Sequence, residues 1–212
     1  MKHYQSWRRG GASHSRVLFQ EIASMAQEHL LWITGFAIAT SIAARFEIPH
    51  EPVPFTLQTM VVLLAGAYLG AFNGAMSQFL YLAMGALGAP VFAGGSSGIA
   101  YLFGPTGGYL LSFPVAAWVV GFFLHRKDRP RVSFLTSLFV MLGADLLIFA
   151  FGTTQLYATY LHNWGRAFEA GFLIFSWWDL LKVAGAAFIY TAPRLRKREN
   201  NKDAEGKRSS QE

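Results

Sequence analysis

Long apolar segments separated by short connections constrain the fold of this chain more than any other feature. They cover residues 30–44, 55–69, 74–87, 109–124, 132–152 and 172–190. A helix needs about 20 mainly apolar residues to cross the hydrocarbon core of a bilayer. With 53% hydrophobic and only 14% charged residues among 212, the composition is that of an integral membrane protein. The sequence therefore predicts an all-α integral membrane protein, a bundle of six transmembrane helices.

The basic residues are distributed unevenly along the chain and predict its orientation in the membrane. If the first apolar segment begins in the cytoplasm, 15 of the 18 lysines and arginines lie on the cytoplasmic side. They are Lys2, Arg8, Arg9, Arg16, Arg126, Lys127, Arg129, Arg131, Arg194, Arg196, Lys197, Arg198, Lys202, Lys207 and Arg208. Because cytoplasmic loops carry an excess of basic residues, we expect both termini to be cytoplasmic. The net charge of +6 then reflects basic residues at the cytoplasmic side of the lipid bilayer. We therefore expect the bilayer, and not nucleic acid, as a partner.

The two ends of the chain differ from its apolar middle. We predict a basic cytoplasmic tail with an interfacial helix at 1–29, the membrane domain at 30–192 and a disordered charged cytoplasmic tail at 193–212. The chain has no cysteine, its histidines lack metal-ligand spacing, and the phosphate-binding motif Gly-x-x-x-x-Gly-Lys-Ser/Thr is absent. We therefore expect no metal site, no catalytic residues and no ATP hydrolysis by this chain itself.

Residues 90–109 are apolar but cannot form one helix. Six of these twenty residues are glycine, and Pro105 removes a backbone donor in their midst. Irregular backbone at membrane depth is tolerated only where it is buried in protein or lines a cavity. We therefore predict that this glycine-rich stretch forms part of a ligand chamber, with a plain external loop as the alternative. The proline-rich connection at 46–54 is a candidate lid.

Asp179 and Lys182 are two charged residues inside the last apolar segment. Three residues apart, they share one face of a helix. Charged groups inside a bilayer usually face a cavity and have a partner. A carboxylate accepts hydrogen bonds and an ammonium donates them, so the pair can hold a group that offers both N–H and C=O, such as a cyclic urea or amide. The alternative is a structural ion pair that fixes helix packing.

Asp145 is a further acid within an apolar segment. Two aspartates in adjacent spans raise the hypothesis of an intramembrane aspartyl hydrolase, in which two carboxylates share one proton. Lys182 beside Asp179 favours the ionised form of that aspartate and opposes such sharing. We therefore predict that Asp145 either forms a polar contact between helices or lies near the cytoplasmic third of its span.

Several motifs occur in a fixed order along the apolar part of the chain. They are Pro54-Phe55-Thr56-Leu57-Gln58-Thr59, Leu69-Gly70, Tyr81-Leu82-Ala83, Pro90-Val91-Phe92-Ala93-Gly94-Gly95 and Gly104-Pro105-Thr106-Gly107-Gly108-Tyr109-Leu110. Together they resemble the BioY biotin transporters, which are the substrate-binding S components of energy-coupling-factor (ECF) vitamin transporters. The resemblance covers about residues 30–190. It implies high-affinity binding and uptake of biotin across the cytoplasmic membrane of a bacterium or archaeon, with biotin as the transported ligand and no cofactor.

The resemblance also implies roles for individual residues. Asp179 and Lys182 fall where the family carries an Asp-x-x-Lys pair, implied to hold the ureido ring of biotin. Ala39 and Ala43 match the small-residue motif by which the first helix meets the transmembrane coupling subunit, which works with two cytoplasmic ATPase subunits. The other predicted biotin-binding residues are Gln58, Tyr81, Phe92, Gly94, Gly95, Gly104, Thr106, Gly107, Gly108, Tyr109 and Trp178.

The chain departs from the family pattern in its charged extensions, in Asp145 and in the glycine-rich stretch. No Arg or Lys between Gly94 and Tyr109 is present to pair with the carboxylate of biotin. Backbone amides of the stretch, or the hydroxyls of Ser96, Ser97 or Thr106, are the candidates. The alternative functions are an S component for another vitamin and a membrane assembly factor in which the acid–base pair is only structural.

Overall fold

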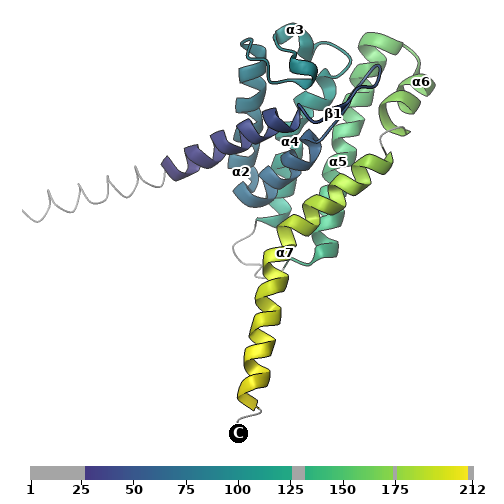
Figure 1. Ribbon diagram of the computed structural model, residues 1–212. Coiled ribbons are helices and arrows are strands. Elements are labelled where there is room, and N and C mark those ends of the chain that lie inside the picture. The colour runs from purple at the N-terminus through teal and green to yellow at the C-terminus, as the bar shows by residue number, and fades with distance from the viewer. Residues whose placement is uncertain (1–26, 126–131, 174–175, 210–212) are drawn as a thin grey trace, which may run out of the picture.

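The computed structural model describes residues 27–125, 132–173 and 176–209 (Figure 1). The helices are a first helix at 27–43, α2 (Gln58–Ala86), α3 (Ile99–Leu102), α4 (Gly107–Leu124), α5 (Phe134–Leu156), α6 (Trp164–Phe168) and α7 (Ser176–Ser209), with a 3-10 turn η1 (Ala93–Gly95) and π-helical turns η2 (Tyr157–Leu161) and η3 (Glu169–Leu173). Strands β1 (Glu47–Ile48) and β2 (Phe55–Thr56) pair antiparallel within the connection between the first helix and α2. The described chain is therefore mainly helical.

Helix α2 folds back on itself at Gly70, whose φ of 81° and ψ of 178° are not helical. A Cβ atom at Gly74 would lie 2.8 Å from the Cα atom of Gly66, although residues eight apart in a straight helix are separated by about 12 Å. At the other end of the hairpin, the Gln58 side-chain amide donates to the Tyr81 hydroxyl at 2.5 Å. The two halves of α2 are therefore antiparallel. The turn lies between the segments 55–69 and 74–87, as the sequence predicts.

Within the described residues, three helices are long and apolar enough to cross a membrane, namely Gln58–Ala86, Gly107–Leu124 and Phe134–Leu161. The helix pair Trp164–Leu173 and Trp177–Pro193, bent by 42°, makes a fourth if it forms a single span. This is fewer than the six spans that the sequence predicts, because α2 contains two of the apolar segments and the first helix is short. The structure thus has three or four candidate spans, and six crossings stay a prediction.

The two ends of the chain are described only in part. The first helix is described from residue 27 onward, whereas residues 1–26, with most of the predicted interfacial helix, lie outside the described residues, as does the basic loop 126–131. Helix α7 continues through Pro193 to Ser209, while the domain boundaries and the disorder expected for the tail stay predictions. Arg, Lys, Glu and Ala are frequent after Pro193, and these residues favour helices.

The long helices close around a common interior. Helix α2 contacts α4, α4 contacts α5, α5 contacts α7, and α7 contacts α2 (Figure 1). Glycines let the first pair approach closely: a Cβ atom at Gly66 would overlap the carbonyl oxygen of Ala117, and one at Gly121 would overlap the backbone of Ala71. Small residues at such contacts are typical of helices packed in a membrane.

We expect Gly66→Ala to destabilise the protein by about 1–3 kcal/mol, because the added carbon must push α2 away from α4. The change should appear as a lower midpoint of thermal unfolding in detergent. Gly143→Ala in α5 is the matched control, since a Cβ atom there meets no atom within 4 Å and alanine is the better helix former. Equal midpoints for the two variants would contradict the close contact.

Candidate ligand-binding site

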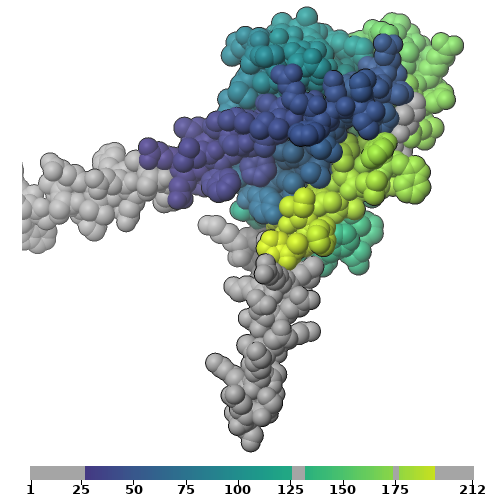
Figure 2. All heavy atoms as spheres, in the orientation of Figure 1, coloured from purple at the N-terminus to yellow at the C-terminus, as the bar shows by residue number. Residues whose placement is uncertain are grey.

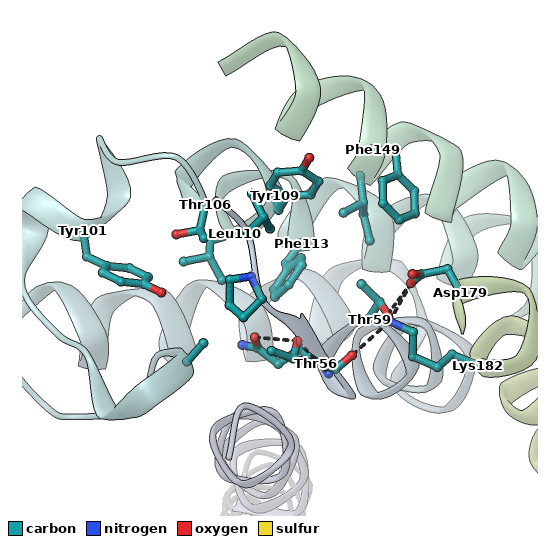
Figure 3. Close-up of a pocket in the computed structure, with 15 residues that line it drawn as sticks. Thr56, Thr59, Tyr101, Thr106, Tyr109, Leu110, Phe113, Phe149, Asp179 and Lys182 are labelled. Carbon is teal, nitrogen blue, oxygen red and sulfur yellow. Dashed lines mark hydrogen bonds and ion pairs between the residues drawn. The ribbon is translucent and has the colours of Figure 1, made fainter. Parts of the chain in front are cut away.

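A cavity with about 520 Å³ of space, including its open side, lies inside the ring of helices (Figure 3). It is lined by Val53, Pro54, Thr56, Gln58, Thr59, Ala93, Tyr101, Thr106, Tyr109, Leu110, Phe113, Ile148, Phe149, Asp179 and Lys182. These side chains come from the proline-rich connection, the start of α2, the glycine-rich stretch, α4, α5 and α7. Figure 3 shows Tyr101 and Thr106 toward one end and Asp179 and Lys182 toward the other. We call this space the main cavity.

Asp179 and Lys182 form a buried ion pair at one end of the main cavity. The Lys182 Nζ atom lies 2.6 Å from Asp179 Oδ1 and donates to the Thr56 carbonyl at 2.9 Å. The Thr59 hydroxyl donates to the same Asp179 Oδ1 atom at 3.2 Å. Asp179 is only 2% exposed, and its Oδ2 atom has no hydrogen-bond partner among the described residues. Because a buried acceptor without a donor is unfavourable, Oδ2 is well suited to accept an N–H group from a ligand.

Gln58 lines the main cavity, whereas Tyr81 and Phe92 lie behind its wall. The Gln58 Oε1 atom accepts from the Thr56 hydroxyl at 3.0 Å while its amide nitrogen donates to Tyr81, so both ends of the amide are held. Phe92 is fully buried and packs edge-on against Tyr81, at 5.6 Å between ring centroids, and stacks on Tyr101 at 5.2 Å. Tyr81 and Phe92 therefore position the lining residues Gln58 and Tyr101.

The glycine-rich stretch forms part of the cavity wall, through Ala93, Tyr101, Thr106 and Tyr109. Gln155 of α5 holds it against the bundle by donating to the carbonyls of Leu102 and Gly104, at 2.9 and 3.0 Å. The Tyr109 hydroxyl also donates to the Gly171 carbonyl at 2.7 Å. The backbone of the glycine-rich stretch thus finds hydrogen-bond partners within the protein.

The glycines predicted to bind ligand shape the stretch but do not line the main cavity. Gly94 and Gly95 have positive φ angles of 63° and 75°, a conformation that other residues rarely adopt. A Cβ atom at Gly107 would overlap the Leu102 carbonyl, and one at Gly108 would clash with α5. Gly104 accepts the bond from Gln155. These glycines therefore determine the backbone conformation and close packing of the stretch: Gly94, Gly95, Gly104, Gly107 and Gly108.

Trp178 does not line the main cavity either. It is 52% exposed and lines a second cavity of about 790 Å³, which shares Thr56 and Lys182 with the main one. The aromatic walls of the main cavity are instead Tyr101, Tyr109, Phe113 and Phe149. Phe113 was identifiable from the sequence, since it lies one helical turn after Tyr109 on the same face of α4.

Asp145 is 3% exposed but does not line the main cavity. It precedes Phe149, a lining residue, by one turn of α5. Its Oδ1 atom has no hydrogen-bond partner in the part of the chain that the structure describes. The predicted polar contact between helices is therefore not seen for this atom.

Ala39 and Ala43, predicted to meet a partner subunit, lie on the first helix. Ala43 is 5% exposed and Ala39 is half-buried. Between them, the Thr40 hydroxyl approaches Gln78 Oε1 at 3.3 Å, so this side of the helix faces α2. The exposed side carries Leu31, Ile38 and Ile42 instead.

Most of the chain resembles proteins of a known family. The sequence profile of the BioY family matches residues 15–199. A probable biotin transporter BioY of Pyrococcus horikoshii is 40% identical over 165 residues, which cover 78% of this chain and 95% of that protein. The biotin transporter BioY of Thermotoga maritima is 39% identical over 164 residues, or 77% of this chain and 93% of that protein.

A solved structure agrees with the sequence comparisons. The crystal structure of the S-component for biotin from an ECF-type ABC transporter matches with a TM-score of 0.72 and 26% sequence identity. The match covers 82% of this chain and 93% of that one. The chain therefore belongs to the BioY family.

Proposed function

We propose that this protein binds biotin and carries it across the cytoplasmic membrane as the S component of an ECF-type transporter. The relatives named as biotin transporters and the solved biotin S-component support this function. The observation that carries the proposal is the buried Asp179–Lys182 pair, which lies at one end of a largely apolar cavity and leaves one carboxylate oxygen unpaired among the described residues.

The pair matches the ureido group of biotin, which offers two N–H donors and one carbonyl acceptor. Asp179 Oδ2 accepts one N–H. The Lys182 ammonium has three donors, of which one faces Asp179 and one binds the Thr56 carbonyl, leaving the third for the ureido oxygen. Phe113 and Phe149 then pack against the apolar ring system. Hydrogen bonds to charged groups in a buried site give both affinity and orientation.

The competing functions have less support. The hydrolase hypothesis needs two carboxylates in one site, but Asp145 does not line the main cavity and Asp179 is paired with Lys182. An S component for another vitamin requires a ligand that fits the same acid–base pair, and the named relatives favour biotin.

We expect Asp179→Asn and Lys182→Met each to weaken biotin binding by about 10- to 100-fold, because each removes a charge-assisted hydrogen bond. Calorimetric titration of biotin into the detergent-purified protein measures the effect, and thermal unfolding of each variant checks the fold. Trp177→Phe is the control, since Trp177 is 79% exposed and lines neither cavity. Unchanged affinity in folded Asp179 and Lys182 variants would overturn the site. A folded wild type that binds thiamine or riboflavin but not biotin would favour the runner-up.

The proposal includes six transmembrane helices with both termini in the cytoplasm. The six are the first helix, the two antiparallel halves of α2, α4, α5 and α7. The reversal at Gly70 supports counting α2 twice, and the basic tails support the orientation. Energy for uptake then comes from a transmembrane coupling subunit and two ATPase subunits, which the match to the S-component of an ECF-type ABC transporter supports.

We place the contact with the coupling subunit on the first helix, which extends away from the bundle in Figure 1. Its exposed side carries Leu31, Ile38 and Ile42, at 72%, 48% and 55% exposure. Gly35 lies among them, and a Cβ atom there would meet nothing within 4 Å. A small residue on an exposed stripe allows another helix to approach closely. Gly35 therefore offers this partner a more accessible contact than the buried Ala43.

We expect Gly35→Trp to leave biotin binding and the unfolding midpoint unchanged but to abolish biotin uptake and co-purification with the coupling and ATPase subunits. The large side chain fits the open space of the isolated protein yet blocks a closely packed partner helix. Gly143→Trp is the control, because Gly143 is equally open but lies on α5. Wild-type uptake by the Gly35 variant would place the interface elsewhere.

A further inference from the structure

The ligand of the proposed function carries a carboxylate, which needs a partner that the main cavity does not supply. Among residues whose side chains are described, the lysines and arginines are Arg45, Arg166 and Lys182. Lys182 is already paired with Asp179 and bonded to Thr56. Arg166 belongs to α6 and lines neither cavity. Arg45 is therefore the cation to consider.

Arg45 lies between the end of the first helix and β1, next to the glycine-rich stretch. Its guanidinium donates to the Pro90 carbonyl. A Cβ atom at Gly95 would lie only 2.7 Å from Arg45 Nη1, so the absence of a side chain at Gly95 lets the guanidinium rest on the turn η1. Ala93, the first residue of this turn, lines the main cavity. No described carboxylate forms an ion pair with Arg45, and most of its five N–H donors stay available.

Arg45 also lines the second cavity, which adjoins the main one. Thr56 and Lys182 line both cavities. The hydrogen bond from Lys182 to the Thr56 carbonyl therefore lies at the border between the two cavities. Phe55 and Trp178 give the second cavity apolar walls. Figure 2 shows the connection between the first helix and α2 at the surface of the molecule, so a charged group here stays in contact with water. The lining of the second cavity is mainly apolar, and its charged residues are Arg45, Glu47 and Lys182. An alkyl chain that ends in a carboxylate suits the apolar walls and the Arg45 guanidinium.

We propose that Arg45 binds the carboxylate of the ligand, whose ring system lies on Asp179 and Lys182 while its alkyl chain runs past Thr56 into the second cavity. This inference rests on the proposed function and adds the residue that distinguishes an acid from its neutral derivatives. A guanidinium matches a carboxylate with two parallel N–H···O bonds. Arg45 thereby pairs with the carboxylate in place of an arginine or lysine of the glycine-rich stretch, which has neither between Gly94 and Tyr109.

The test compares biotin with biotinamide, in which a neutral amide of the same length replaces the carboxylate. We expect the wild type to bind biotin about tenfold or more tightly than biotinamide. Arg45→Gln should weaken biotin binding by that factor and leave biotinamide within about twofold, and Arg166→Gln, the matched control, should change neither. Because the Arg45 side chain is exposed, the preference for biotin should also shrink at high salt.

The outcomes separate this inference from the proposed function. Equal wild-type affinities for the two ligands overturn the role of Arg45 but leave biotin binding intact, and this comparison needs no variant. Equal weakening of both ligands by Arg45→Gln shows that Arg45 only holds the glycine-rich turn, which also overturns the inference. A folded wild type that binds neither ligand overturns the proposed function and the inference with it. Arg45→Lys, which keeps the charge but loses the planar fork, should retain part of the preference.

Discussion

The buried ion pair of Asp179 and Lys182 joins helix α7 to Thr59 and Thr56, which lie 120 and 126 positions earlier in the sequence than their partners. Removing two charges from water is unfavourable unless hydrogen bonds compensate both. The Thr59 hydroxyl from α2 and the Thr56 carbonyl from the β1–β2 connection supply those bonds. Helix α7, helix α2 and the connection must therefore meet at this point. The cavity lies beside this ion pair, and one carboxylate oxygen of Asp179 is left without a partner among the described residues.

A second constraint acts on the glycine-rich stretch, whose irregular backbone must find hydrogen-bond partners within the protein. Gln155 of α5 serves two carbonyls, Arg45 serves a third, and the Gly98 amide donates to the Gly85 carbonyl at 2.8 Å. These bonds come from α5, the end of the first helix and the second half of α2. The stretch is thereby fixed as a wall of the cavity, and the same arginine is placed beside the route of an acidic ligand.

Much of the fold follows from the sequence because apolar segments indicate where long helices form and glycines indicate where the chain turns. Helices α4 and α5 lie where segments 109–124 and 132–152 predict them, and the turn of α2 falls at Gly70. Helix α7 continues past Pro193, where strong helix formers follow that proline. The short strands β1 and β2 were not predicted, since two-residue strands leave no periodic pattern.

The sequence by itself determined the membrane class, the family and the acid–base pair, because composition, motifs and the spacing of two residues on one helix are local properties. Only the tertiary structure decided which side chains line the cavity. It placed Tyr81 and Phe92 behind the wall, left the five glycines out of the lining, and brought Tyr101, Phe113 and Phe149 onto the wall. It also brought Arg45 to the glycine-rich stretch. Such contacts between residues far apart in the chain depend on how helices pack, which no single segment specifies.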